Sequence, residues 1–94
     1  MNNKIALVTG ATSGIGKKIT EELIDSGVIV IANYGHDEVK ANELKNKYND
    51  KIHLIKADIS YDLEVKNMFN EIKNKYGKLN YLINNAGTNI DSYI

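Results

Sequence analysis

The sequence predicts an α/β fold in which helices cover both faces of a parallel sheet. Four short apolar runs alternate along the 94 residues with three longer segments whose apolar residues recur at helical spacing, and no proline interrupts them. The stretches between successive apolar runs are too long to be hairpin turns. Parallel strands joined by right-handed helical crossovers are therefore the expected arrangement.

Composition excludes several classes of function. Twelve lysines balance six aspartates and six glutamates, and this net charge of zero gives no reason to expect nucleic acid or an anionic membrane as a partner. The lack of cysteine and the isolation of His36 and His53 exclude disulfides and a zinc or redox cluster. The longest apolar runs fall far short of the roughly 20 residues of a membrane span, and residues 1–4 do not open a secretory signal. We expect one cytoplasmic unit over residues 1–94.

The first strand and helix are predicted over residues 5–8 and from Ile15 to Gly27. Residues 5–8 form a continuous apolar run, as expected of a strand that is buried on both faces of a parallel sheet. Gly27 supplies the C-terminal stop of the helix. The apolar face of this helix is predicted to be Ile15, Ile19, Leu23 and Ile24.

The second strand and helix are predicted between residues 28 and 51. The β-branched run 28–32 forms the strand, residues 33–36 form a turn, and Asp37 caps the helix. Polar residues 49–51 end this unit. The apolar face of the helix is predicted to be Val39, Ala41, Leu44 and Tyr48.

A third strand is predicted over residues 52–57, and Ser60 is predicted to cap the helix that follows. The first turn of this helix carries Asp62 and Glu64, which are favourable near the positive end of a helix dipole. Gly77 ends the helix. Its core face is predicted to be Val65, Met68, Phe69, Ile72 and Tyr76.

A fourth strand over residues 79–83 leads into a turn at residues 84–87. If this strand returns to the far side of the first, the strand order is 3-2-1-4. The first two helices then cover one face of the sheet and the third covers the other. A ligand site is expected at the carboxyl ends of the first and fourth strands, where the strand order reverses.

The glycine-rich segment from Thr9 to Gly16 follows the first strand and opens the first helix. Gly10 permits a tight turn, Gly14 lets backbone N–H groups approach a diphosphate, and Gly16 lets the helix pack close to the strand. The spacing departs from G-x-G-x-x-G, and a turn of this kind without a ligand is the alternative. A P-loop is excluded because Gly16 is followed by Lys17-Lys18-Ile19.

Three motifs in register resemble the N-terminal half of the short-chain dehydrogenase/reductase family. They are Thr9-Gly10-x-x-x-Gly14-Ile15-Gly16, Asp58-Ile59 after the third strand, and Asn84-Asn85-Ala86-Gly87 after the fourth. The resemblance implies a doubly wound Rossmann-type sheet, with residues 1–94 as the NAD(P)-binding portion and the catalytic half absent. It is nearest to 3-oxoacyl-acyl-carrier-protein reductases through Asn33-Tyr34, Lys40-Ala41-Asn42-Glu43 and the tail from Gly87 to Ile94. Glucose dehydrogenase-like members share the Asn-Tyr and Ala-Asn features.

Carried over position by position, the resemblance implies contacts with every part of a nicotinamide dinucleotide. The glycine-rich segment would hold the diphosphate and a ribose, and residues 85–87 would border the ribose on the nicotinamide side. Asp58 would accept a hydrogen bond from the adenine amino group, with a backbone contact from Ile59. Two alternatives stay open, because Asp58 could serve as a cap and Asn84 and Asn85 could brace the backbone. The implied cofactor-binding residues are Gly10, Thr12, Ser13, Gly14, Ile15, Gly16, Tyr34, Asp58, Ile59, Asn85, Ala86 and Gly87.

The cofactor preference depends on the end of the second strand. NAD-dependent relatives place an Asp there for the ribose 2′-OH, and NADP-dependent relatives place a basic group. Tyr34 stands at that position, so no carboxylate repels a 2′-phosphate. Asp37 and Glu38 lie near the spacing of a ribose acid but are assigned to the start of the second helix. NADP is the expected cofactor and NAD the alternative, with positive charge supplied by Lys17, Lys18 or His36.

The expected function is that of an NADP-preferring short-chain reductase, which transfers hydride between the nicotinamide and a carbonyl or alcohol. The resemblance points to reduction of 3-oxoacyl thioesters in fatty acid biosynthesis. For a full-length protein it also implies an acyl-carrier-protein-linked substrate and a homotetramer. The alternatives are a glucose dehydrogenase-like activity, a non-catalytic NAD(P)-binding module and a truncated remnant.

The family's catalytic Ser and Tyr-x-x-x-Lys are expected beyond residue 94. None of the six tyrosines is followed by a lysine at the fourth position. Because a positioned acid contributes a factor of roughly 10² to 10⁴ to such catalysis, the chain alone is expected to hold a nucleotide without turning it over. The fourth strand would leave an apolar edge, so we also expect marginal stability or aggregation.

Overall fold

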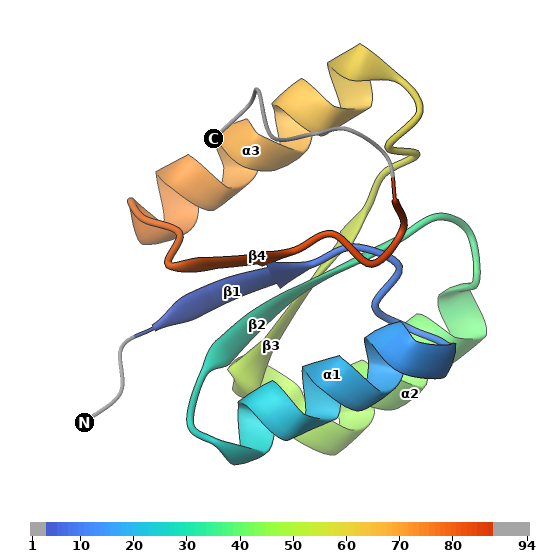
Figure 1. The fold of residues 1–94 in the computed structure, drawn as a ribbon, viewed down its shortest axis with the longest axis vertical. Helices are drawn as coiled ribbons and strands as arrows, with labels where there is room; N and C mark the ends of the chain where they lie inside the picture. The colour runs from blue at the N-terminus through green and yellow to red at the C-terminus, as the bar shows by residue number, and fades with distance from the viewer. Residues whose placement is uncertain (1–3, 88–94) are drawn as a thin grey trace.

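The structure, a computed structural model, describes residues 4–87 and has three layers (Figure 1). A parallel sheet in the order β3-β2-β1-β4 lies between α1 and α2 on one face and α3 on the other. The predicted strand order and the placement of the helices are confirmed. None of the helices in the described part of the chain is both long enough and apolar enough to cross a membrane. The elements in chain order are β1 (Ile5–Val8), α1 (Gly14–Asp25), β2 (Ile29–Tyr34), α2 (Glu38–Tyr48), the short 3₁₀ helix η1 (Asn49–Lys51), β3 (Ile52–Lys56), α3 (Asp62–Tyr76) and β4 (Tyr81–Ile83).

Each face of the sheet packs against its own apolar core. Alternate residues of a strand point to opposite faces, so the continuous apolar run of β1 contributes to both cores. The core under α1 and α2 includes Ala6, Val8, Val30, Ala32 and Leu44. The core under α3 includes Ile5, Leu7, Ile31, Met68 and Ile72.

The buried face of α1 differs from the predicted one. Ile15 was predicted on the apolar face, but its side chain is 71% exposed. The buried residues Gly16, Thr20 and Ile24 are spaced by four and form one stripe along the helix, with Ile19 and Leu23 packed beside it. Since this stripe begins at Gly16, Ile15 lies outside it and faces solvent.

The second strand is longer than predicted. Asn33 and Tyr34 were assigned to a turn, but they continue β2 and pair with Ile55 and Lys56 of β3. The Tyr34 carbonyl also accepts a 3.0 Å hydrogen bond from the N–H of Ala57. Ladder pairing with β3 therefore outweighs the turn preference of Asn.

The fourth strand is shorter than predicted and begins at Tyr81. Asn80 meets β1 partly through its side chain, because Oδ1 of Asn80 accepts a 2.8 Å hydrogen bond from the N–H of Ile5. The N–H of Asn80 in turn donates to the Ile5 carbonyl at 2.9 Å. A side-chain oxygen thus satisfies a donor that would otherwise bond to the backbone of the neighbouring strand.

The cap predicted for α3 was wrong. The hydroxyl of Ser60 donates to Oδ1 of Asp58 at 2.6 Å, and α3 begins after Tyr61 without a side-chain cap. Oε1 of Glu64, in the first turn of α3, instead accepts a 2.7 Å hydrogen bond from the N–H of Asp58. The C-terminal stop at Gly77 is confirmed, since its φ of 72° is the left-handed conformation that glycine favours.

The predicted cap of α2 is confirmed, but one residue of its predicted apolar face was wrong. Asp37 accepts a hydrogen bond from the N–H of Lys40, as an N-cap should. Ala41 and Leu44 are buried, whereas Val39 is 70% exposed. Val39 lies about 200° around the helix from Ala41, which places it on the solvent side.

We predict that Leu44→Ala and Val39→Ala will differ sharply in their effect on stability. Leu44→Ala removes a buried side chain and should lower the free energy of unfolding by about 2–5 kcal/mol. Val39→Ala changes an exposed position and should alter it by no more than about 0.5 kcal/mol. Urea unfolding of the two variants measures the difference, and equal losses would mean that α2 docks through another face.

Candidate functional site

The predicted site lies where the carboxyl ends of β1 and β4 meet (Figure 1). The turn after β1 leads into α1 on one face of the sheet, and β4 is reached from α3 on the other face. Ligands of open α/β sheets bind at such a point because the connections diverge to opposite faces there. The segment from Thr9 to Gly16 and residues 84–87 are brought together at this point.

Thr9 ties the two segments to each other. Its side chain is completely buried, and its hydroxyl donates to Oδ1 of Asn84 at 2.9 Å while accepting from the N–H of Ala86 at 3.0 Å. The N–H of Thr9 donates to the carbonyl of Ile83 at 3.0 Å. Thr9 is not among the predicted site residues. Its place as a polar residue directly after a buried strand is the feature of the sequence that could have indicated its role.

Asn85 holds the glycine-rich turn from the other side. Its Nδ2 donates to the carbonyl of Gly10 at 3.1 Å. Gly10 has a φ of 59°, and a Cβ at this position would lie 3.1 Å from that same nitrogen. Asn85 therefore braces the backbone of the glycine-rich turn, which is the alternative role given for it above. Because Asn85 is also exposed, its solvent-facing side stays open to a ligand.

Gly16 allows the first turn of α1 to lie directly on the glycine-rich turn. A Cβ on Gly16 would overlap the carbonyl oxygen of Gly10 and would lie 2.7 Å from Nδ2 of Asn85. No side chain fits there without displacing backbone. The packing role predicted for Gly16 is therefore confirmed.

The start of α1 is an exposed helix N-terminus without a compensating carboxylate. Ser13, Gly14 and Ile15 are exposed, Ser13 makes no capping hydrogen bond, and the first turn contains no acidic residue. The first N–H groups of a helix lack intrahelical acceptors and carry partial positive charge, so this end attracts an anion. Thr12, also predicted to contact a ligand, is only 5% exposed and offers little surface.

The first turns of the other two helices carry carboxylates. Glu38 lies in the first turn of α2, and Asp62 and Glu64 lie in the first turn of α3. These acidic side chains offset the positive ends of their own helix dipoles. Among the three α-helices of the described residues, α1 alone therefore presents an uncompensated positive end.

Asp58 presents an exposed carboxylate at the end of β3. Its Oδ1 accepts hydrogen bonds from the hydroxyl of Ser60 at 2.6 Å and from the N–H of Ser60 at 3.0 Å. These two bonds, the hydroxyl first, hold the pKa of Asp58 below its usual value, so the group is ionised at neutral pH. Ile59, by contrast, is half-buried and packs against the core under α3.

Asn33 joins the end of β2 to both neighbouring segments. Its carbonyl accepts a 2.9 Å hydrogen bond from the N–H of Ala11 in the glycine-rich turn. Its buried side chain donates through Nδ2 to the carbonyls of Ile55 and Ala57, at 3.3 and 3.1 Å. The end of β2 is therefore held against the turn that opens α1.

An ion pair that sequence reasoning missed lies beside Tyr34. Nζ of Lys56, the last residue of β3, donates to Oε2 of Glu38 at 2.7 Å. The sequence alone indicates only a helix-start position for Glu38 and no role for Lys56. The register Tyr34↔Lys56 would have indicated the proximity, but strand register is set by tertiary pairing and is not visible in either segment alone.

His53 has contacts that the sequence could not show. Its Nε2 lies 2.6 Å from Oε2 of Glu71, and its Nδ1 lies 3.5 Å from the hydroxyl of Tyr76. These partners belong to α3, and His53 lies in the interior of β3 rather than at its carboxyl end. Among the described residues, no cluster of three or more His, Cys, Asp or Glu could hold a metal ion.

The chain belongs to the short-chain dehydrogenase family, because the family model described as short chain dehydrogenase matches residues 4–94. The stretch after Gly87, which contributed to the resemblance seen in the sequence, lies outside the described residues. The four-stranded Rossmann-type arrangement agrees with this membership.

Curated relatives differ in length and in activity. The short-chain dehydrogenase/reductase homolog YusS of Bacillus subtilis (strain 168) is 40% identical over 87 residues, which cover 89% of this chain and 80% of that protein. The 3-oxoacyl-acyl-carrier-protein reductase FabG of Staphylococcus epidermidis is 38% identical over 96 residues, covering 98% of this chain but 39% of that protein. Farnesol dehydrogenase of Aedes aegypti is 36% identical over 88 residues, covering 89% of this chain and 36% of that protein.

A solved structure described as a putative 3-oxoacyl-reductase from Bacillus thuringiensis superposes with a TM-score of 0.87. It is 31% identical to this chain, and the match covers 93% of this chain and 37% of that one. The chain thus spans most of YusS and slightly more than a third of the longer enzymes.

We predict that Gly16→Ala will destabilise the chain because the added methyl group has no space. The free energy of unfolding should fall by about 1–3 kcal/mol, the usual range for overpacking. Gly35→Ala is the matched control, since a Cβ at Gly35 meets no atom within 4 Å, and it should change the value by no more than about 0.5 kcal/mol. Urea unfolding checks both, and an unchanged Gly16→Ala variant would contradict the close contact.

Proposed function

We propose that residues 1–94 bind a nicotinamide dinucleotide across the carboxyl ends of β1 and β4, as the dinucleotide-binding portion of a short-chain reductase. The observation that carries this proposal is the start of α1, which rests on the Gly10 turn without a carboxylate in its first turn. Such an end favours a diphosphate through free N–H groups and the helix dipole. When bound, the nicotinamide supplies or accepts the hydride.

The remaining parts of a dinucleotide have complementary groups nearby. In the proposal, Ser13, Gly14 and Ile15 contact the diphosphate and a ribose, and Asp58 accepts from the adenine amino group. Both described bonds to the Asp58 carboxylate use Oδ1, so Oδ2 is the oxygen that suits an amine donor. Residues 85–87 are exposed, and Ala86 and Gly87 are small residues that allow the close approach of a sugar. Ile59 contributes through its backbone, and Thr12 contributes little.

We further propose that the cofactor is NADP and that the substrate is a 3-oxoacyl thioester carried by acyl carrier protein. Support for the cofactor comes from the last residue of β2, which is Tyr34 and not an acidic residue. Support for the substrate comes from two comparisons, the Staphylococcus epidermidis FabG reductase and the Bacillus thuringiensis structure, whose descriptions name 3-oxoacyl reduction. This role is a cytoplasmic one in fatty acid biosynthesis.

A second candidate is a module that binds the dinucleotide without catalysing hydride transfer. The relation to YusS favours it, because this chain covers 80% of that protein's length.

We predict that Gly14→Asp will weaken the binding of NADPH. A Cβ at Gly14 meets no atom within 4 Å, so the new carboxylate has room at the helix start, where it opposes the diphosphate. Because the φ of 55° at Gly14 strains any L residue, circular dichroism must first show that the variant keeps the fold of the parent. Affinity should fall at least about tenfold, as expected from losing a charge-assisted contact and adding repulsion. Isothermal titration with NADPH measures this change.

Gly77→Asp is the matched control, since Gly77 has a similar positive φ and equally open surroundings but lies at the opposite end of the sheet. This variant should bind NADPH as the parent does. Failure of the parent chain to bind either NADPH or NADH would overturn the proposal. Oxidation of NADPH on adding a 3-oxoacyl pantetheine thioester would overturn the module, whereas binding without oxidation agrees with both candidates, because the family's catalytic residues are expected beyond residue 94.

A further inference from the structure

Lys56 and Tyr34 are cross-strand partners at the carboxyl ends of β3 and β2. Paired residues of neighbouring strands point to the same face, and so do residues two positions apart in one strand. Ala32 and Leu54, two positions earlier, belong to the core under α1 and α2. The side chains of Lys56 and Tyr34 therefore project on the face that also carries the start of α1.

This corner of the sheet lies next to the glycine-rich turn. The N–H of Ala11 donates to the carbonyl of Asn33 at 2.9 Å, which joins the turn to the last residues of β2. In folds of this type the ribose nearest the adenine lies over the end of the second strand, where an acidic or basic group reads its 2′ substituent. A group at the ends of β2 and β3 is thus placed to contact that substituent.

An exposed ion pair, in which a phosphate can replace the carboxylate, occupies this position. Lys56 and Glu38 are joined at 2.7 Å, and their side chains are 53% and 57% exposed. The hydrogen bond that Lys56 donates to Glu38 raises the pKa of Lys56, with smaller effects in the same direction from Tyr34 and Glu64. An exposed pair of this kind contributes little stability, whereas a phosphate carries more charge and more acceptor oxygens than one carboxylate.

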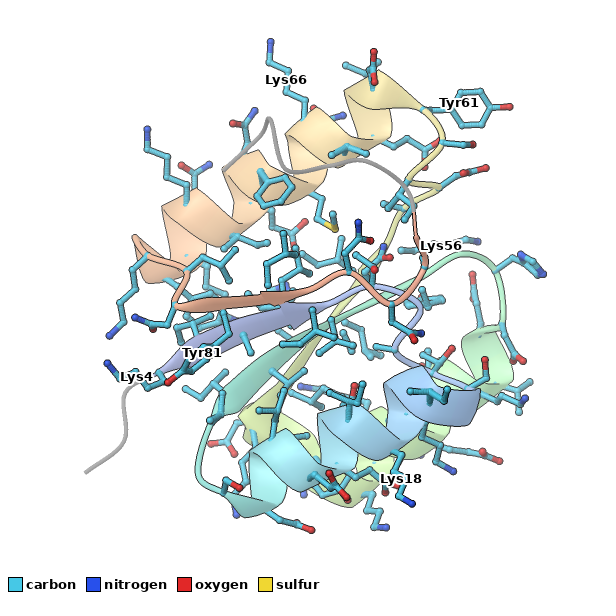
Figure 2. All side chains as sticks on the ribbon, in the orientation of Figure 1. Lys4, Lys18, Lys56, Tyr61, Lys66 and Tyr81 are labelled. Carbon is cyan, nitrogen blue, oxygen red and sulfur yellow. The ribbon has the colours of Figure 1, made fainter. Side chains whose placement is uncertain are left out.

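The lysines proposed earlier for this role are less well placed. In Figure 2, Lys18 projects from α1 on the side away from the sheet, whereas Lys56 lies near the turn that follows β2. Lys17 belongs to the same helix, and its charge acts on Glu21, one turn further along α1. Lys56 is the last residue of β3 and lies two positions before Asp58, which the resemblance connects with the adenine.

We propose that Lys56 recognises the 2′-phosphate of NADPH and that Glu38 holds the lysine in place when no phosphate is present. This inference rests on the proposed dinucleotide site and names the residue that sets its cofactor preference. Replacing Lys56 should remove the preference for the phosphorylated ligand. Replacing Glu38 should strengthen that preference, because the lysine loses its competing partner.

The test uses two probes that differ only in the 2′-phosphate, adenosine 2′,5′-diphosphate and adenosine 5′-monophosphate. With Lys56→Met, affinity for the 2′-phosphorylated probe should fall about tenfold or more, while affinity for the other stays within about twofold. With Glu38→Gln, the affinity for the 2′-phosphorylated probe should rise relative to the affinity for the other probe. Titration calorimetry at low salt measures both, since salt screens exposed charge pairs.

Lys66→Met is the matched control, because Lys66 projects from the outer side of α3 away from this corner (Figure 2). Its affinities should equal those of the parent. If the parent binds both probes and neither Lys56→Met nor Glu38→Gln changes their ratio, the role of Lys56 is overturned and the dinucleotide site stands. If the parent binds neither probe nor NADPH, both proposals are overturned.

Discussion

The close approach of Gly16 to the carbonyl of Gly10 is the constraint on which the rest of the site depends. It sets α1 directly on the turn after β1, and the same carbonyl accepts the side chain of Asn85 from the segment after β4. Thr9 completes the connection through its buried hydroxyl. Two segments about 75 residues apart in the chain are thus fixed against each other before any ligand binds, which is the preorganisation that a binding site requires.

The distribution of carboxylates gives this rigid corner its electrostatic character. The helices α2 and α3 begin with acidic residues that offset their own dipoles, whereas α1 begins without one. A chain of zero net charge therefore has a local preference for an anion at one helix end. Asp58 lies at the end of another strand, β3, and hydrogen bonds from Ser60 lower the pKa of its carboxyl group. This hydrogen-bond acceptor is therefore separate from the anion-binding position at the start of α1.

Much of this fold could be predicted because its strands are buried on both faces and read as continuous apolar runs. β1 agrees residue for residue, and the strand order follows from crossover rules. One error, the strand conformation of Tyr34, falls where tertiary pairing outweighs local preference. Another, the exposed side chain of Val39, is an error of helical position, since Val39 and Ala41 cannot share one face of a helix. The Lys56–Glu38 pair could not be predicted, because it depends on strand register and on how α2 sits over the sheet.

The most direct test of the dinucleotide site is to add NADPH to isotope-labelled chain and follow backbone amide signals by NMR. The site described above requires the largest shifts at residues 10–16, 58–59 and 85–87, with little change near Gly77 at the opposite end of the sheet. Shifts confined to those segments would establish the ligand's position without relying on turnover. Saturating NADPH that leaves the amides of residues 13–16 unmoved would contradict it, whatever other signals changed.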